Sequence, residues 1–194
     1  MGFQIFDGTG TSQKAKVTAE NRLATDSVNR SERESQALQG DSYLVGTGLV
    51  TLTNAATSAV LYFQNDNDFD LIVTRYLIST GATTSGTTST VLGVIVKNPT
   101  TMAAGSGNPV LAPNANFGSS NELTLTSEIG AQGASLTGGS NLAAIYAPVE
   151  QLTTAEASTI LPKGASLGVT ITPPASNTSI TVSVGLNVHR VPVK

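Results

Sequence analysis

The sequence of 194 residues contains no cysteine, no tryptophan and one histidine, and only 12% of its residues are charged. The lack of cysteine excludes disulfides, a thiolate nucleophile and cysteine-ligated zinc, and it leaves the redox compartment open. A single histidine excludes a histidine-rich metal site. No apolar run approaches the roughly 18–20 residues of a membrane-spanning helix. Residues 1–16 lack the basic start and apolar stretch of a signal peptide, so we expect none there.

The few charges are unevenly distributed along the chain. The first 41 residues contain 11 of the 23 charged residues, and the other 153 contain 12. An ordinary soluble domain is about 25% charged. We therefore predict two regions, an extended charged N-terminal arm over residues 1–41 and a body over residues 42–194 with a polar but nearly uncharged surface. With a net charge of −3, the chain is a poor candidate for binding nucleic acid.

An uncharged surface favours association. Lys and Glu are depleted at protein interfaces and normally keep soluble proteins apart. The body is instead rich in Thr, Ser, Asn, Gly and Ala, which suits a surface that lies against identical copies. A soluble monomer with hydroxyl-rich strands is the alternative reading of the same composition.

The body shows the sequence pattern of an all-β protein. Short runs rich in β-branched and aromatic residues alternate with clusters of Gly, Asn, Asp and Pro, which is typical of strands and turns. Residues 98–120 are expected to form a long loop, and residues 153–157 could form a helical turn. About eight strands at this spacing predict a sandwich or barrel. The strands are expected within residues 42–53, 58–64, 70–79, 90–97, 122–126, 141–146, 165–172 and 179–190.

We predict a jelly-roll-like β-sandwich, because several strands are apolar at consecutive positions and unprotected strand edges favour closure or oligomerisation. Apolar side chains expected in its core or against sister subunits are Leu61, Phe63, Ile72, Val94, Ile95, Val169, Ile171, Val182 and Val184.

The arm contains too little apolar material to fold alone. Residues 14–18 and 23–28 suggest a small hairpin or two extended pieces. Residues 31–38 suggest a short helix, with Ser31 as N-cap, Glu34 three residues later and Gly40 at its end. The arm could dock on a neighbour, pack on its own body or remain a tail. Its basic residues alternate with acids and lack interleaved aromatics, which favours protein–protein ion pairing over nucleic-acid binding. The predicted partner-binding residues are Lys14, Lys16, Val17, Arg22, Leu23, Arg30 and Arg33.

Two further patterns concern sites of chemistry. Asp66, Asp68 and Asp70 have the spacing of a calcium loop, but Leu71 and Leu77 occupy the positions where an EF-hand needs Gly and Glu, so a turn is the better interpretation. His189 lies alone within a terminal strand, and no nucleophile elbow accompanies it, which favours a structural role. We therefore expect no catalytic residue, no cofactor and no metal.

The arm resembles the N-terminal segment of tailed-phage virion proteins. The similar residues are Gly8-Thr9-Gly10, then Lys14-Ala15-Lys16-Val17 and Glu20-Asn21-Arg22-Leu23, followed by residues 34–43 and 61–66. The resemblance covers roughly residues 8–80. It implies a virion structural component, of a kind that is often a trimeric jelly roll on the capsid surface.

Three functions remain open at this point. The first is a non-enzymatic capsid decoration or cement protein, which would be a homo-oligomer, expected to be a trimer, bound to the major capsid protein or other virion proteins and to neither nucleic acid nor membrane. The second is a tail, neck or fibre-associated protein that binds a host surface through residues 98–120 and 130–141. The third is a hydrolase or carbohydrate-active jelly roll that depends on His189.

Overall fold

A computed structural model describes residues 16–17, 23–24, 32–53, 56–84, 90–174 and 179–191 of this protein. The chain divides into two compact units, residues 1–31 and residues 32–194. In the first unit, strands β1 (Lys16–Val17) and β2 (Leu23–Ala24) pair antiparallel, so the hairpin alternative is confirmed. The boundary between the units lies inside the predicted arm, because the helix that follows belongs to the second unit.

Helix α1 (Glu32–Gln39) confirms the predicted helix. Gly40 has a positive φ of 75°, and its N–H donates to the Ala37 carbonyl while the Asp41 N–H donates to the Gln36 carbonyl. This double hydrogen bond is the Schellman arrangement that ends a helix at glycine. The helix contacts β3 and β14, described below, and is therefore part of the body.

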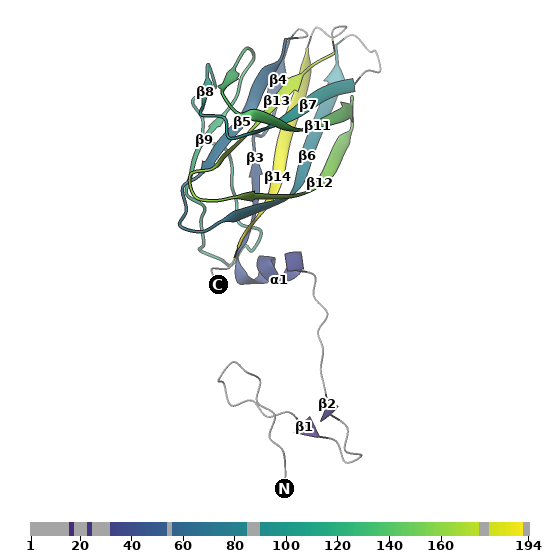
Figure 1. The fold of residues 1–194 in the computed structure, drawn as a ribbon. Helices are drawn as coiled ribbons and strands as arrows, with labels where there is room; N and C mark the ends of the chain where they lie inside the picture. Colours follow the sequence, from purple (N-terminus) through teal and green to yellow (C-terminus); the bar gives the residue numbers. More distant parts are fainter. Residues whose placement is uncertain are drawn as a thin grey trace. The chain divides into compact units, whose positions relative to one another are not determined.

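The body is all-β, as predicted, and two antiparallel sheets face each other across its core (Figure 1). One sheet has the order β11-β7-β13-β5-β9, and the other has the order β12-β6-β14-β3, with β4 also paired to β14. Strands β8 and β10 form a separate pair. The strands are β3 (Ser42–Gly46), β4 (Val50–Leu52), β5 (Ser58–Asn65), β6 (Leu71–Thr83), β7 (Thr90–Lys97), β8 (Thr101–Ala103), β9 (Leu125–Ile129), β10 (Ser135–Thr137), β11 (Ser140–Pro148), β12 (Leu152–Leu161), β13 (Ser166–Thr172) and β14 (Ile180–Arg190).

The strand pairs are nested in the manner of a jelly roll. Strand β7 pairs with β11, β6 with β12, β5 with β13 and β3 with β14. This is one long antiparallel ribbon whose successive pairs alternate between the two sheets. The jelly-roll-like fold expected from the sequence is therefore present, with β9 as an additional strand beside β5.

The core lies between the two sheets. Seven of the nine predicted core residues are buried, and Phe63 on β5 is its largest fully buried apolar side chain. Ile72 and Val94 are only partly buried, and Ile72 lines a pocket described below. Both lie one residue out of phase with the inward-facing positions of β6 and β7, because successive side chains of a strand point to opposite faces.

Three local predictions are changed by the structure. Residues 153–157 form part of β12 instead of a helical turn, because pairing with β6 overrides the helix propensity of this short stretch. The strand expected at 122–126 begins at Leu125. The loop 98–120 contains β8 and then runs along the free edge of β3, where Leu111 and Asn114 form bridges to Gly46 and Tyr43.

Candidate functional site

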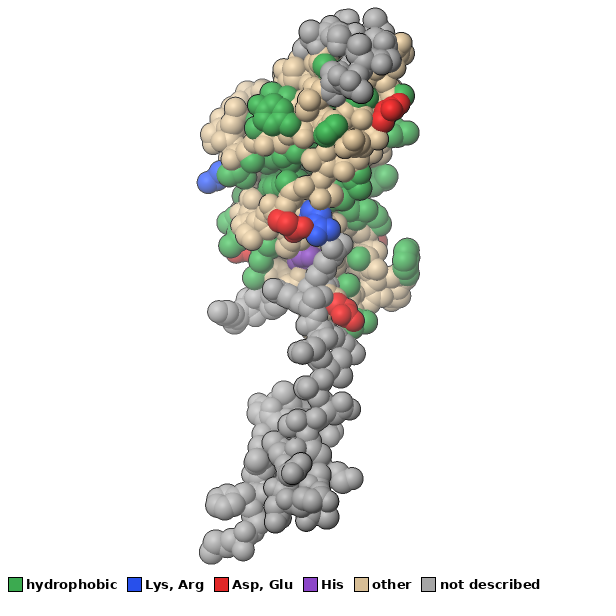
Figure 2. Space-filling model, turned by 90° about the vertical axis from the view of Figure 1, so that its right-hand side faces the viewer, with side chains coloured by type: hydrophobic (Ala, Val, Ile, Leu, Met, Phe, Trp, Pro, Cys, Tyr) green, Lys and Arg blue, Asp and Glu red, His purple; other side chains and the backbone are tan. Residues whose placement is uncertain are grey.

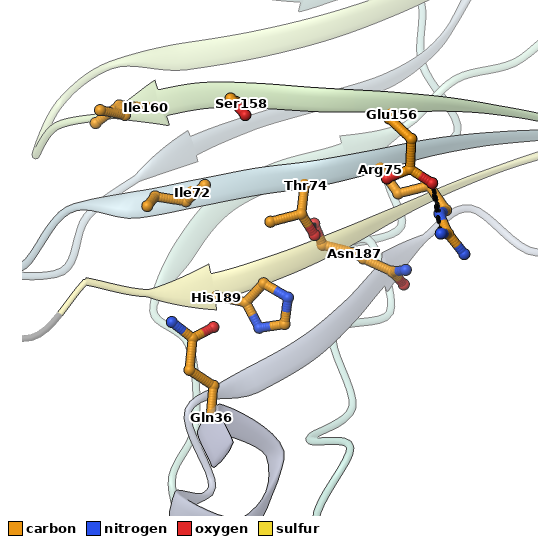
Figure 3. Close-up of a pocket in the computed structure, with 9 residues that line it drawn as sticks. All are labelled: Gln36, Ile72, Thr74, Arg75, Glu156, Ser158, Ile160, Asn187 and His189. Atoms are coloured by element: carbon orange, nitrogen blue, oxygen red, sulfur yellow. Dashed lines mark hydrogen bonds and ion pairs between the residues drawn. The ribbon is translucent and has the colours of Figure 1, made fainter. Parts of the chain in front are cut away.

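The outer face of the sheet β12-β6-β14-β3 contains a pocket at a point where the strand register is irregular (Figure 3). Between Arg75 and Val73, strand β6 has one residue, Thr74, whereas the facing segment of β12 between Glu156 and Thr159 has two. The pairing register between β6 and β14 also shifts at Thr74, because Asn187 pairs with Arg75 and the next residue, Val188, pairs with Val73. Bulges of this kind re-aim side chains and are frequent beside functional sites.

Two cross-strand ladders form the walls of the pocket. On one side, Arg75 of β6 lies between its register partners Glu156 of β12 and Asn187 of β14. The Nε and Nη2 atoms of Arg75 donate to Oε1 of Glu156 at 2.8 and 2.5 Å. This wall is polar, and its one positive and one negative charge are paired with each other.

The opposite wall is more apolar. Ile72 of β6 lies between Ile160 of β12 and His189 of β14 in the register of the sheet. His189 is 2% exposed, and Gln36 of α1 lies beside it at the end of the pocket (Figure 3). His189 is thus buried in the body and also lines a pocket, and its structural role stays a prediction.

The bulge residues lie between the two walls. Thr74 of β6 and Ser158 of β12 both line the pocket, and the hydroxyl of Thr74 donates to the backbone carbonyl of Asn187 at 3.4 Å. The cavity measures about 390 Å³, which is within the usual range of about 300–1,000 Å³ for small-molecule sites. We call this cavity the sheet pocket. Its lining is Gln36, Ile72, Thr74, Arg75, Glu156, Ser158, Ile160, Asn187 and His189.

Asn187 is the unusual member of the sheet pocket. The residue is 9% exposed, and within the described part of the chain its side-chain amide makes no hydrogen bond. Its amide atoms are not fully buried, so water or a ligand in the sheet pocket can reach them. The amide therefore has hydrogen-bonding capacity that is directed to whatever fills the pocket.

The edge formed by β11 and β12 is a second candidate surface. These are end strands of the two sheets, and they lie next to one another (Figure 1). Large apolar side chains are exposed on both, including Leu142, Tyr146 and Leu152. Glu156 is the only charged residue of the two strands, and it is already paired with Arg75.

The low charge of the body is visible on its surface. On the face drawn in Figure 2, green and tan side chains predominate over the few red and blue ones. No helix in the described ranges is long and apolar enough to cross a bilayer.

The predicted partner-binding residues lie outside the part of the chain whose side chains the structure describes. Three of the seven lie outside the described residues, and for the other four the structure describes the backbone. Lys14, Arg22 and Arg30 form the first group, and Lys16 and Val17 in β1, Leu23 in β2 and Arg33 in α1 form the second.

The three aspartates of the calcium-like pattern do not form a metal site. Asp68 forms an ion pair with Lys163, which lowers the pKa of the carboxyl and raises that of the ammonium. Asp66 accepts a hydrogen bond from Gln64 at 3.0 Å. Within the described ranges no three acidic or histidine side chains, those of Asp66, Asp68 and Asp70 included, gather closely enough to hold a metal ion.

Sequence reasoning missed Thr74, Ser158 and Asn187. Each is a polar residue inside a strand, which on its own indicates only an outward-facing position. Their convergence depends on bulges in strands that are far apart in the sequence, and no local signal marks those bulges.

Comparisons with known proteins do not assign the chain to a family. No family model matches it, and no curated protein matches it. A chain in the structure of infectious bursal disease virus, Gx strain, is similar at a TM-score of 0.17 and 10% identity, over 78% of this chain and 41% of the viral chain. This chain therefore spans about two fifths of that viral chain, and a similarity this weak carries no argument.

Proposed function

We propose that this protein is a non-enzymatic structural protein of a phage virion, which decorates or cements the capsid surface as an oligomer. The jelly-roll body, the weakly charged surface and the resemblance of residues 8–80 to tailed-phage virion proteins support the proposal. The observation that carries it is the double edge formed by β11 and β12, whose single charged residue, Glu156, is paired with Arg75.

This edge is suited to a second copy of the same chain. Natural edge strands are usually protected by lysines, prolines or charges, because their unpaired backbone groups bind other strands. Strands β11 and β12 carry no lysine, their one proline, Pro148, is the last residue of β11, and they expose Leu142, Tyr146 and Leu152. With Glu156 neutralised by Arg75, two copies meet there without like-charge repulsion.

In this proposal, the N-terminal segment binds neighbouring capsid subunits. Its mixed charges set the register of the contact more than its strength. Many weak contacts repeated over a symmetric shell then give tight overall attachment. The basic side chains of Lys14, Lys16 and Arg22 are the proposed points of contact.

The oligomeric state of the full chain tests the edge. Analytical ultracentrifugation should show an oligomer, expected to be a trimer. Substituting Leu152→Lys or Tyr146→Lys should weaken it at least about tenfold, since burying such a side chain contributes about 1.5–3 kcal/mol. Phe117→Lys is the matched control, because Phe117 is also exposed but lies in the loop 98–120. A monomeric wild-type chain would contradict the proposal.

Particle binding tests the N-terminal segment. The full chain with Lys14→Glu, Lys16→Glu and Arg22→Glu should lose occupancy on phage capsids while keeping its fold by circular dichroism. A control with Lys97→Glu, on the body, should keep occupancy. Cryo-electron microscopy of the particle then distinguishes the capsid surface from the tail or neck, and a position on the tail would favour host-surface binding instead.

A further inference from the structure

The sheet pocket contains a side-chain amide, that of Asn187, which has no role in the proposed assembly. Asn187 is 9% exposed as a residue and lines the cavity, and its amide makes no hydrogen bond within the described part of the chain. The amide is accessible from the cavity, so in the absence of a ligand water can be its partner. A ligand with both donors and acceptors would supply the partner that the chain does not.

The charges of the sheet pocket restrict the class of ligand. Arg75 and Glu156 are hydrogen-bonded to each other, so the polar wall has no net charge. An anion attracted by Arg75 would meet the carboxylate of Glu156 at the same point. A cation has no cluster of ligating side chains here, or elsewhere in the described ranges. The ligand that fits is therefore neutral.

The distribution of polar and apolar side chains indicates the shape of that ligand. One wall presents an amide, a guanidinium and a carboxylate, which are planar groups that can each contact two adjacent hydroxyls. The other wall presents Ile72 and Ile160. A sugar ring has hydroxyls around its rim and apolar C–H groups on its faces, so it matches both walls.

We propose that the sheet pocket binds one ring of a neutral saccharide. Asn187 and the Arg75–Glu156 pair contact its hydroxyls, and Ile72 and Ile160 contact a C–H face. The hydroxyls of Thr74 and Ser158, exposed between the walls by the bulges, complete the polar contacts. The pocket belongs to a single chain, and because Glu156, Ser158 and Ile160 lie on β12 together with Leu152 of the proposed interface, the two proposals are tested with separate variants.

Titration of the full chain with glucose, galactose, mannose and N-acetylglucosamine, followed by ¹⁵N NMR, tests the proposal. At least one of these sugars should shift backbone amide signals of Thr74, Arg75, Ser158 and Asn187 in a saturable manner. Glucuronate should bind more weakly than glucose, because its carboxylate would lie near Glu156.

Two variants and a matched control locate the binding. Asn187→Ala should weaken binding at least about tenfold and Ser158→Ala by a smaller factor, since each removes hydrogen-bonding groups. Thr154→Ala should leave the affinity unchanged, because Thr154 is exposed on the same strand but does not line the sheet pocket. If Asn187→Ala does not fold, Asn187→Asp retains the size of the side chain while adding a charge, and it should also weaken binding.

Several results would overturn the proposal. These are the absence of saturable shifts with all four sugars, affinity unchanged in the Asn187 and Ser158 variants, or a preference for glucuronate over glucose. The assembly proposal is judged separately, since the Leu152→Lys variant should bind sugar as the unmodified chain does even if it no longer forms oligomers.

Discussion

The Oδ1 atom of Asn65 accepts two hydrogen bonds from Asn67, one from its backbone N–H at 3.0 Å and one from its side-chain Nδ2 at 2.8 Å. Asn65 is fully buried, and its own Nδ2 donates to the carbonyls of Phe69 and Leu161 at 2.9 Å. One side chain thus joins the end of β5, the turn that follows it and the end of β12.

Replacing this side chain should be costly. Asn65→Ala would remove the four hydrogen bonds of the Asn65 side chain. Each buried group that loses its hydrogen-bond partner costs about 1–3 kcal/mol. We expect a loss of at least about 3 kcal/mol in the free energy of unfolding, measured by urea denaturation. Asn141→Ala on the exposed strand β11 is the control and should change stability by less than about 0.5 kcal/mol. Equal losses in both variants would contradict the proposed role of the buried network.

Gly130 should not tolerate a side chain. A Cβ atom added there would lie 1.8 Å from the backbone carbonyl oxygen of Ala59, and the Gly130 N–H donates to the carbonyl of Val60 on β5. Backbone atoms cannot move aside as a flexible side chain does, so Gly130→Ala should destabilise the fold by about 3 kcal/mol. Thermal denaturation measures the effect. Gly118→Ala, where the new Cβ meets only Asn116 Oδ1 at an ordinary 3.5 Å, should leave the melting temperature nearly unchanged.

The Arg75–Glu156 ion pair should contribute little to stability. The side chains are 34% and 73% exposed, so solvent screens their attraction. A double-mutant cycle with Arg75→Gln and Glu156→Gln should give a coupling of about 0.2–1 kcal/mol, falling further in 1 M NaCl. A coupling of several kcal/mol that is insensitive to salt would show that the pair is shielded from solvent, contrary to its exposure.

Asp66 should make stability depend on pH in the acid range. A side-chain hydrogen bond from Thr126 lowers the pKa of the Asp66 carboxyl below its usual value, and a bond from Gln64 acts in the same direction. A carboxyl with a lowered pKa in the folded state contributes stability that is present above the unfolded pKa and is lost as the pH falls through the folded pKa. Urea denaturation between pH 2 and pH 6 should show this loss below about pH 4.

The variant Asp66→Asn isolates that contribution. Its free energy of unfolding should decrease less on acidification than that of the unmodified chain. Asp70→Asn, the same substitution at an exposed position of the same turn, is the matched control. If the free energy of unfolding of Asp66→Asn decreased on acidification as much as that of the unmodified chain, the pH dependence would arise from other carboxyl groups.

Local sequence patterns were sufficient for the class of fold and for most elements. Alternating and β-branched runs bounded by Gly, Asn and Pro predicted the strands that contain Phe63, Ile95 and Ile171, because side-chain period and turn chemistry act between near neighbours. The same is true of α1, where Ser31, Glu34 and Gly40 provided the signals at its two ends. Residues 153–157 were misread because five residues are too few to separate helix propensity from a paired edge strand.

The sequence alone therefore determined that this protein is an all-β chain with a charged N-terminal segment and a weakly charged body. The tertiary structure alone decided that α1 belongs to the body and that β11 and β12 form a free double edge. It also decided that Thr74, Ser158 and Asn187 line one pocket. The physical reason is that the pocket arises from the pairing register of three strands distant in sequence, and register is set by packing of the whole sandwich.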